Sequence, residues 1–318
     1  GEPGANMVSL TRRGLLLGAG AGVAAAAALA LSGCSLGQAP QRIRMACGEQ
    51  GGTYVQFGEL LRDALDKDGT TGLEVVTTGG SLANLALLQA RDAELAIVLA
   101  DAAATDAQNK VAIGRVYQNY LQCFVRSGGP IGGVGDLAGR RVSVGAPQSG
   151  AALTARRVLT SLGLLDGPGT AVVSELYLDE AMAAIEADAV DAIFWSGGLP
   201  LPAVQNLEAG VELVDLTSAL PALEVEFPGV YTLTAVPAST YGSDAAVPAI
   251  GVSNYLLARP DLPDDIADSL VDVLIRDAAQ LVPEGSLGVQ YLTASNLIDT
   301  SPIALHPAAQ RRYRQLYG

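Results

Sequence analysis

Residues 43–67 read IRMACGEQGGTYVQFGELLRDALDK, and this stretch contains the unit from which the rest of the fold can be inferred. The apolar run Ile43–Cys47 predicts a buried β-strand. The segment Thr53–Lys67 predicts an α-helix, because large apolar side chains recur at helical spacing on one face. These side chains are Phe57, Leu60, Leu61 and Leu65. Between the two elements, Gly51-Gly52-Thr53-Tyr54 provides glycines for a tight turn and a hydroxyl that can cap the helix.

The same alternation of a short strand and a longer helix continues along the chain. Further strands are predicted at Leu73–Thr77, Leu95–Leu99, Arg141–Gly145, Ala171–Tyr177 and Asp191–Trp195. Further helices are predicted at Ser81–Arg91, at about residues 150–162, and at Asp179–Ala187. Strict alternation of this kind predicts parallel sheets that are covered by helices.

The alternation falls into two blocks, which predicts a two-lobed α/β protein. The segment Tyr120–Gly133 runs from one block into the next, and the extended segment Val247–Leu257 can carry the chain back. We therefore expect one lobe from residues 35–133 plus 246–318 and a second from residues 134–245, joined by two crossover segments. Ligands in such sheets bind beyond the carboxyl ends of the strands, so the cleft between the lobes is the expected site.

Three strand-to-helix turns share a composition that suits ligand binding. They are Gly51-Gly52-Thr53-Tyr54, Thr77-Thr78-Gly79-Gly80-Ser81 and Gln148-Ser149-Gly150. Glycine lets a backbone approach a ligand closely, and a helix N-terminus presents free N–H groups that suit a carboxylate. Each turn alone is typical of an ordinary capped helix start. Three such turns on two lobes that face one cleft indicate a binding site.

The candidate ligand-binding residues come from these turns and from the strand that precedes residue 198. They are Thr53, Tyr54, Thr78, Gly80, Ser81 and Asn84 in the first lobe, and Ser149, Gly150, Trp195, Ser196 and Gly197 in the second. Backbone N–H groups and hydroxyls are expected to hold a carboxylate, while Tyr54 and Trp195 supply apolar cover.

Other polar side chains have two interpretations. Asp101 could meet an amine on the ligand, or it could cap a helix over Ala102–Asn109. Four arginines could pair with a carboxylate but are more typical of solvated or ion-paired surface groups, and two tyrosines could lie at the rim of the cleft. These residues are Arg140, Arg141, Arg156, Arg157, Tyr231 and Tyr241.

The N-terminal segment has the composition of an export signal. Arg12-Arg13 precedes an uncharged run, Leu15–Leu31, which leads into Ser32-Gly33-Cys34. Because the run consists largely of weakly hydrophobic Ala and Gly and stops at this triplet, we favour a cleaved signal over a membrane-spanning helix. The triplet resembles the lipobox of bacterial lipoproteins, which implies a signal over residues 1–34 and lipidation at Cys34. The paired arginines resemble a twin-arginine export signal.

Composition excludes several classes of function. The net charge of −14 argues against binding to nucleic acid, which would repel such a protein. Cys47 and Cys123 lie in apolar runs, which favours buried thiols over a disulfide. The sequence shows no metal-ligand spacing, cofactor loop or nucleophile–base pair, so we expect no cofactor, no metal and no enzymatic activity. The single histidine, His306, stands in a C-terminal loop.

An ordered set of motifs extends along the chain from about residue 43. It runs through Gly51–Tyr54, Thr78–Ser81 with Asn84-Leu85, an Ala-Glu-Leu-Ala strand ending at Asp101, Asp136–Gly145, Ser149-Gly150, Thr154–Arg157, Asp191–Trp195 and Ile303–Pro307. This order resembles the TAXI group of solute receptors of TRAP transporters. The resemblance implies a type II periplasmic-binding-protein fold, closure of two lobes on a ligand, and delivery to a TRAP permease in the membrane. It also implies a structural role for His306-Pro307.

Several positions depart from the pattern of that family. Val55 stands where a second tyrosine is usual, and Ala100 stands where a serine is usual. The turn that ends at Ala151 lacks one hydroxyl of the usual Gly-Ser-Gly-Thr. Family members are associated with glutamate and related dicarboxylates such as 2-oxoglutarate. Because one lost hydroxyl can change ligand preference by orders of magnitude, these positions bear directly on which solute is bound.

The sequence therefore predicts a monomeric, extracytoplasmic lipoprotein that captures a small carboxylate-bearing solute, such as an amino acid or a dicarboxylate. Two alternatives remain open. The protein could report its ligand to a membrane sensor kinase, or it could be an enzyme on the same two-lobed fold.

Overall fold

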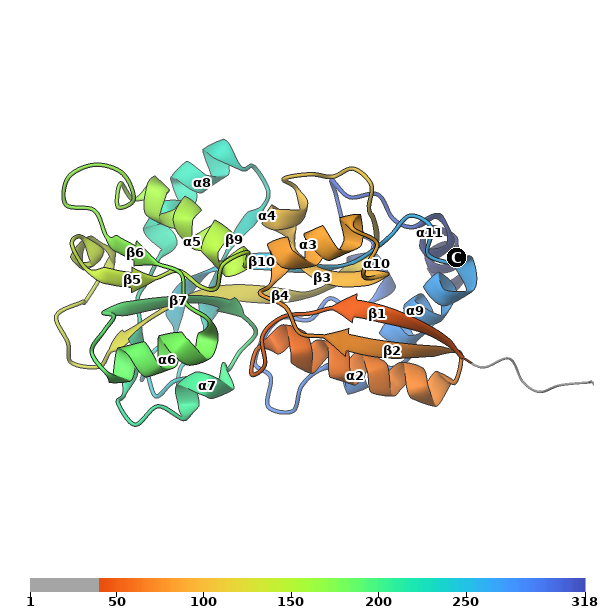
Figure 1. Ribbon diagram of the computed structural model, residues 1–318, viewed down its shortest axis with the longest axis horizontal. Coiled ribbons are helices and arrows are strands. Elements are labelled where there is room, and N and C mark those ends of the chain that lie inside the picture. Colours follow the sequence, from red (N-terminus) through yellow and green to blue (C-terminus); the bar gives the residue numbers. More distant parts are fainter. Residues whose placement is uncertain (1–39, 318) are drawn as a thin grey trace, which may run out of the picture. The chain divides into compact units, whose positions relative to one another are not determined.

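The structure is a computed structural model, and it describes residues 40–317. The predicted signal and the lipidation site Cys34 lie outside the described residues. Ten strands form one sheet in the order β2-β1-β3-β10-β4-β7-β5-β6, with β8 added to β4 and β9 added to β10 (Figure 1). The strands are β1 (Gln41–Ala46), β2 (Thr71–Val76), β3 (Leu95–Leu99), β4 (Val111–Arg126), β5 (Arg141–Ser143), β6 (Val172–Ser174), β7 (Ala192–Gly197), β8 (Val211–Leu213), β9 (Tyr231–Val236) and β10 (Val247–Ala258).

Helices cover both faces of this sheet. In Figure 1, α3, α4, α5 and α8 lie on one side of the strands, and α2, α6 and α7 lie on the other. The helices are α2 (Thr53–Asp68), α3 (Ser81–Gln89), α4 (Ala100–Ala103), α5 (Gly150–Ser161), α6 (Leu178–Glu186), α7 (Pro202–Gln205), α8 (Leu220–Glu226), α9 (Asp264–Arg276), α10 (Ala294–Leu297) and α11 (Pro307–Tyr317). Short 3₁₀ turns are η1 (Val134–Leu137), η2 (Thr217–Ala219) and η3 (Ala278–Leu281). No helix among the described residues combines the length and apolar character that crossing a membrane requires.

The two ends of the sheet are parallel, as the strand–helix alternation predicts. Strand β1 pairs in parallel with β2 and β3 at one end, and β5 pairs in parallel with β6 and β7 at the other. The predicted helices at Thr53 and Ser81 begin at those residues, and α5 begins at Gly150. The local sequence therefore places these helix starts correctly.

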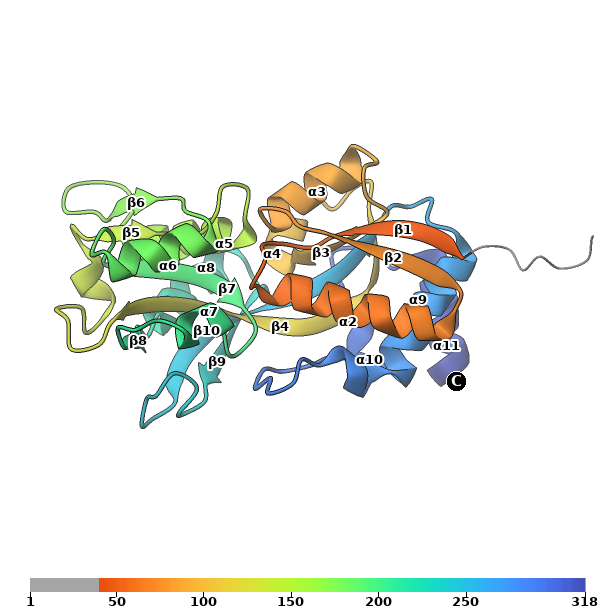
Figure 2. The same cartoon turned by 60° about the horizontal axis from the view of Figure 1, so that its bottom comes forward.

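The middle of the sheet differs from the expectation. The segments expected to cross between the lobes are parts of two long strands, β4 and β10, which pair antiparallel with each other. β4 starts at Val111, nine residues before the expected crossing segment, and continues to pair with β7 through Tyr120–Val125. Figure 2 shows β4 running from one half of the sheet into the other. The expected lobe boundaries at residues 133 and 246 thus lie just beyond the end of β4 and just before β10.

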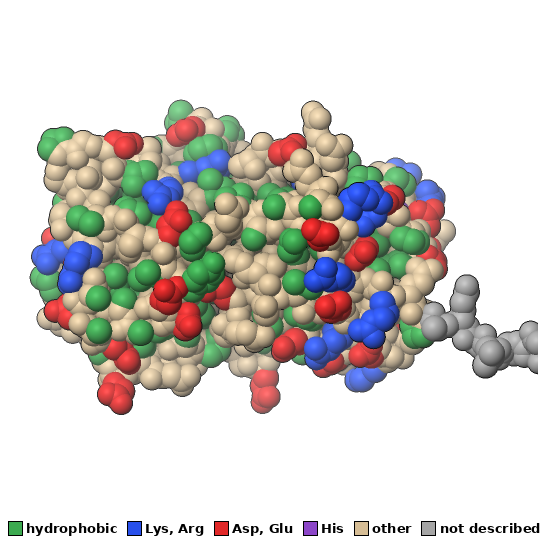
Figure 3. Space-filling view, viewed as in Figure 1, with side chains coloured by type: hydrophobic (Ala, Val, Ile, Leu, Met, Phe, Trp, Pro, Cys, Tyr) green, Lys and Arg blue, Asp and Glu red, His purple; other side chains and the backbone are tan. Residues whose placement is uncertain are grey.

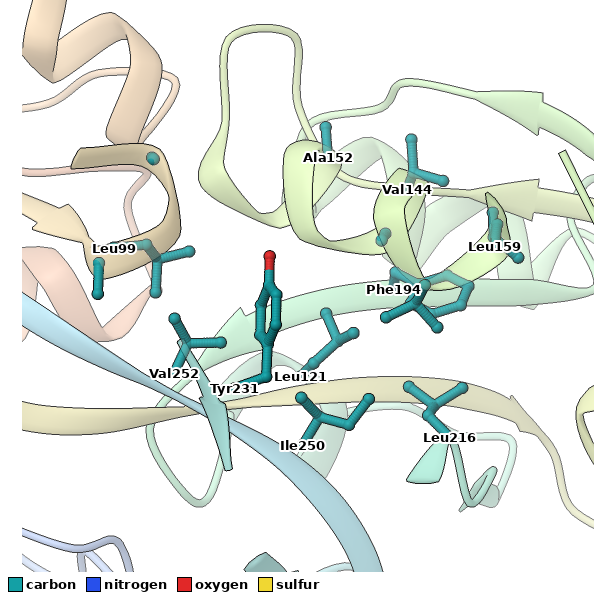
Figure 4. Packing of buried hydrophobic residues seen from close by; sticks show 14 of the residues in the cluster. Leu99, Leu121, Val144, Ala152, Leu159, Phe194, Leu216, Tyr231, Ile250 and Val252 are labelled. Atoms are coloured by element: carbon teal, nitrogen blue, oxygen red, sulfur yellow. The ribbon is translucent and has the colours of Figure 1, made fainter. Parts of the chain in front are cut away.

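Two hydrophobic clusters stabilise this arrangement. One lies beneath α2, where Phe57, Leu61 and Leu65 are buried on one face and pack with residues of α9 such as Leu270. The other draws residues from both halves of the sheet: Leu99 ends β3, Tyr231 begins β9, and Val144 follows β5 (Figure 4). At about 25 cal/mol per Å² of apolar surface, such continuous packing favours association of the two halves in this conformation.

The two cysteines and the single histidine that the sequence analysis discussed are all buried among other residues of the protein. Cys47 and Cys123 are free and fully buried thiols. His306 is also buried, and its Nδ1 atom accepts a hydrogen bond from Ala308 N, so Nε2 donates to the carbonyl of Leu262 at 2.8 Å. The histidine therefore ties the start of α11 to the segment before α9, which agrees with the structural role that was expected of it.

Gly58 offers a test of packing beneath α2. A Cβ atom at this position would lie 2.6 Å from Cys47 Sγ and 3.3 Å from Val75 Cγ2. We expect Gly58→Ala to lower the free energy of unfolding by about 1–2 kcal/mol through overpacking. In an open helix position the same change would stabilise the protein by about 1 kcal/mol.

Urea unfolding of the single and double variants checks this prediction. In a Cys47→Ala background the clash is absent, so Gly58→Ala should become neutral or stabilising there. Glu59→Ala, one residue further along at an exposed position, is the matched control. Equal costs of Gly58→Ala in both backgrounds would contradict the predicted contact.

Candidate solute-binding site

A small cavity of about 40 Å³ lies where the glycine-rich turns of the two halves meet, and we call it the central cavity. Its lining residues are Gly48, Glu49, Gly52, Thr53, Tyr54, Gly79, Gly80, Ser81, Leu99, Asn119, Ser149, Gly150, Ala151, Trp195 and Ser196. The lining therefore includes most of the residues singled out in the sequence. Thr78, Asn84, Asp101 and Gly197 do not line it.

Thr78 and Asn84 hold the second turn in place from behind. Asn84 is fully buried, and its amide nitrogen donates to the carbonyl oxygens of Cys47 and Ile97 at 2.5 and 2.8 Å. Its amide oxygen accepts from Thr78 Oγ1 at 2.5 Å, while Gly80 N donates to the same threonine oxygen at 3.1 Å. The side chain of Asn84 thus connects β1, β3 and the turn that opens α3.

Asp101 connects the two halves of the sheet. It lies in the first turn of α4, which spans Ala100–Ala103 and is shorter than the helix expected over residues 102–109. Its Oδ2 atom accepts from Thr154 Oγ1 at 2.5 Å and from the hydroxyl of Tyr231 at 2.9 Å, and its Oδ1 atom accepts from Ala102 N. Burial raises the pKa of this carboxyl, and the two hydroxyl hydrogen bonds oppose the rise. Asp101 is fully buried and bonded to protein groups.

Three helices begin at the central cavity, at Thr53, Ser81 and Gly150. The first N–H groups of a helix have no acceptor within that helix. Among residues 40–317, nothing accepts from the N–H groups of Thr53 and Tyr54 or from those of Gly150 and Ala151. The starts of α2 and α5 therefore present unpaired donors on opposite sides of the cavity.

The start of α3 is instead occupied by a protein group. Leu82 N and Ala83 N both donate to the carbonyl oxygen of Gln148, at 3.0 and 3.1 Å. Gln148 holds a positive φ of 64°, an unusual conformation for a residue with a Cβ atom. This strained turn of the second half is thus docked on the helix start of the first.

The two halves approach so closely that glycine is needed at the contact. A Cβ atom at Gly150 would lie 2.6 Å from both Leu99 Cδ1 and Ser81 Oγ. Gly80 has a φ of +125°, which residues with a side chain rarely adopt. A Cβ atom at this position would come against Ser149. The glycines of the turns therefore allow the halves to touch each other around the cavity.

Trp195 contributes an unusual donor to the site. The residue is 9% exposed, and its indole Nε1 atom is buried without a hydrogen-bond partner among the described residues. The ring lies against Gly52 and Gly197, where added Cβ atoms would come within 3.2 and 2.5 Å of it. Buried indole N–H groups normally find a partner, but this atom faces Gly197 and has almost no exposed surface, so a solute can reach it only if the two halves separate.

The remaining polar groups of the cavity bond to one another. Tyr54 donates to Asn254 Oδ1 at 2.6 Å, and its hydroxyl lies 3.3 Å from Ser81 Oγ. Ser81 Oγ also accepts from Leu99 N. Asn119 receives a hydrogen bond from Asn254 and donates to Ser196 Oγ at 3.3 Å. Ser149 Oγ caps α5 by accepting from Ala152 N at 3.0 Å.

Glu49 is the charged residue of the lining, and sequence analysis did not select it. It lies in the first turn and accepts from Leu178 N, at the start of α6, at 2.7 Å. Burial raises the pKa of this carboxyl, and the nearby charges of Asp179 and Glu180 raise it further. Because Glu49 lies in the glycine-rich turn Gly48–Tyr54, its position in the sequence could have identified it as a candidate. Asn119 was also missed, because it lies inside β4, where no turn marks it.

None of the four candidate arginines lines the central cavity, and three of them have partners elsewhere. Arg141 pairs with Asp191 at 2.8 Å, and Arg156 pairs with Glu175 at 2.9 Å, both at the surface. Arg157 donates to the hydroxyl of Tyr231 and stacks on the ring of Phe227. Acidic and basic side chains are interspersed on the face shown in Figure 3. Within residues 40–317 there is no cluster of His, Cys, Asp and Glu that could hold a metal ion.

Comparison with known proteins shows the family to which the chain belongs and a solved protein with a similar fold. Residues 45–315 match the NMT1-like family. A solved protein from Bordetella bronchiseptica RB50 superposes with a TM-score of 0.56 at 13% identity, over 88% of this chain and 99% of that chain. Similarity at this identity reflects a shared fold. The two-lobed α/β periplasmic-binding-protein fold that was expected from the sequence is confirmed.

Two further structures show weaker similarity. The periplasmic aliphatic sulphonate binding protein SsuA from Escherichia coli has a TM-score of 0.45 at 16% identity, over 87% of this chain and 83% of its own. The GluR0 ligand-binding core from Nostoc punctiforme, solved in complex with L-glutamate, has a TM-score of 0.46 at 16% identity, over 75% and 95%.

The raised pKa of Glu49 yields a test of the electrostatics. The folded protein protonates this carboxyl at a higher pH than the unfolded chain does, so its charge lowers stability at neutral pH. Glu49→Gln keeps an oxygen that can accept from Leu178 N and removes the charge. We expect the variant to be more stable than the wild type at neutral pH, with the difference shrinking as the pH falls toward about 5.

Urea unfolding of both proteins at several pH values measures this difference. Asp101 also has a raised pKa and contributes to the pH dependence of stability in both proteins. The contribution of Glu49 is therefore given by the difference in unfolding free energy between the two proteins at each pH. Asp191, whose pKa is lowered to about 2 by Arg141, titrates outside this range. A difference that stays constant with pH would contradict the assignment.

Proposed function

Because the chain belongs to the NMT1-like family, we propose that it is an extracytoplasmic solute-binding receptor without enzymatic activity. The observation that carries this proposal is the central cavity itself. It is closed between two halves of an α/β sheet, beyond the carboxyl ends of parallel strands, where such folds bind ligands. Its described lining combines glycines, hydroxyls, the amide of Asn119, aromatic rings and one carboxylate with the apolar side chains of Leu99 and Ala151.

The donors of the cavity favour a carboxylate on the solute. The unpaired N–H groups at Thr53 and Gly150 begin helices of 16 and 12 residues, whose N-termini carry partial positive charge. The unpaired Nε1–H of Trp195 becomes a third donor if separation of the halves exposes it. Glu49 on the same lining favours a solute that also carries an ammonium group. The proposed solute is therefore a small carboxylate, and Glu49 favours an amino acid such as glutamate over a keto acid such as 2-oxoglutarate.

The volume of the cavity implies that the halves must separate for a solute to enter. A cavity of about 40 Å³ has room for a few water molecules, which is less than an amino acid or a dicarboxylate requires. The polar contacts that would break include three hydrogen-bonded links: Gly198 N donates to Thr53 Oγ1, Leu178 N donates to Glu49, and two N–H groups of α3 donate to Gln148. A solute that replaces part of this network in the closed form shifts the equilibrium toward closure.

The order of motifs along the chain supports a TRAP-type permease as the membrane partner, within the TAXI group of receptors. Diacylation at Cys34 would hold the receptor at the membrane surface after removal of the signal. The acidic charge of the chain keeps the protein from adhering to anionic lipid headgroups, so the lipid would act as a tether.

A thermal screen tests the receptor function. Purified residues 35–318 are heated with amino acids, dicarboxylates and keto acids, and the melting temperatures are compared. A cognate solute at 100 times its dissociation constant should stabilise the protein by about 2.7 kcal/mol. Turnover of one of these compounds, with no solute raising the melting temperature, would overturn the proposal.

Substitutions at the donors test the site. We expect Trp195→Phe to weaken binding of the identified solute by about tenfold, because one buried donor is lost. Its effect on the solute-free protein should be small, since that donor has no protein partner. Ser81→Ala and Ser149→Ala should also weaken binding.

Ser149→Ala should in addition lower stability by about 1 kcal/mol, because Ser149 caps α5. Isothermal titration gives the affinities, and urea unfolding gives the stabilities. Unchanged affinity in all three variants would place the solute elsewhere.

A further inference from the structure

A second cavity of about 130 Å³ lies beside the central cavity, and we call it the side cavity. It is enclosed by the first turn of α2, the middle of β4, the segment after β7 and residues 281–290. Thr53 lines both cavities, and its Oγ1 atom accepts from Gly198 N at 3.1 Å. This hydrogen bond stands between the two cavities, and the role of the side cavity does not depend on the solute of the central one.

Amide groups without protein partners gather at the side cavity. The side chains of Gln56, Gln205 and Gln290 line it, and they come from α2, α7 and the segment before α10. None of these three amides makes a hydrogen bond with another described residue. Each offers both a donor and an acceptor. Gln118 is already engaged, since its amide bonds with Thr234 and Tyr291.

Tyr117 supplies an unsatisfied buried group at the same place. The residue lines the side cavity and is 5% exposed, and its buried hydroxyl lies near Thr53 without forming a hydrogen bond of normal geometry with any described residue. Its ring packs on Phe57 with centroids 5.6 Å apart, so the phenol is held in position. An orphaned buried hydroxyl in a native fold calls for a partner that arrives from outside the chain.

The charge of the side cavity excludes an anion. Its lining contains no Lys, Arg or His, and its one ionisable acid is Glu284 at the exposed rim. The floor carries apolar surface from Phe57, Leu199 and Leu281. The site thus combines uncharged donors and acceptors with apolar walls, and its lining lacks the cationic side chains that would neutralise a carboxylate.

We propose that the side cavity binds an uncharged carboxamide group. A carboxamide oxygen can accept from Tyr117, and its nitrogen can exchange hydrogen bonds with the glutamine amides, which have the same donor and acceptor pattern. The size fits a small molecule of this class, since a protein cavity of about 150 Å³ holds benzene. Acetamide is smaller than benzene and serves as the probe.

An NMR titration tests the proposal. Acetamide is added to ¹⁵N-labelled protein, and the isosteric anion acetate is added in a parallel titration. Acetamide should shift the side-chain amide signals of Gln56, Gln205 and Gln290, while acetate should leave them unchanged. Equal effects of the two probes on these signals, or no effect of acetamide, would overturn the proposal.

Matched variants locate the effect. Tyr117→Phe removes only the orphaned hydroxyl, so the fold should persist while acetamide binding weakens by about threefold to tenfold. Gln290→Ala, at a half-buried position, should weaken binding to a similar degree. Gln89→Ala, at the exposed end of α3, is the control and should bind as the wild type does. Unchanged affinity in both Tyr117→Phe and Gln290→Ala would remove the side cavity as the site.

Discussion

Strands β4 and β10 pair antiparallel, from Val111 opposite Ala258 to Leu121 opposite Ile250, and both ends of the sheet attach to this pair. β3 bonds to β10 at one end, while β7 bonds to β4 at the other. Every turn at the central cavity is therefore positioned relative to these two strands. Because the strands are shared, bending along them would change the distance between the halves without breaking either parallel unit.

The contacts across the central cavity are of two kinds, and they have different consequences. Buried apolar packing around Leu99 and Tyr231, together with the bonded Asp101, stabilises the closed arrangement directly. The polar contacts of Glu49 and Gln148 use groups that water could satisfy equally well in an open form, so each has a modest net value. A closed form of marginal stability is what a receptor requires if its solute is to decide between open and closed states.

The sequence predicted the elements whose signals are local. A strand, a glycine-rich turn and a helix start can be recognised within about fifteen residues, and the starts of α2, α3 and α5 were placed correctly for this reason. Only the C-terminal part of β4, from Tyr120, was predicted as extended. Its hydrophobic pattern there resembles that of a linker that leads into a Gly- and Pro-rich segment. Asn119 was missed with it, and Asn84 was selected although its bonds all go to neighbouring backbone and Thr78.

By itself, the sequence determined an α/β chain in which three glycine-rich turns open helices, because turn chemistry and hydrophobic period act over short distances. Only the tertiary structure decided how these turns meet. It docked Gln148 on α3, left the Nε1 atom of Trp195 without a hydrogen-bond partner among residues 40–317 and placed Glu49 at the start of α6. It also brought Tyr117 and three glutamines to the lining of one side cavity. These contacts join residues far apart in the chain, and their geometry follows from the packing of the whole sheet, which no local pattern encodes.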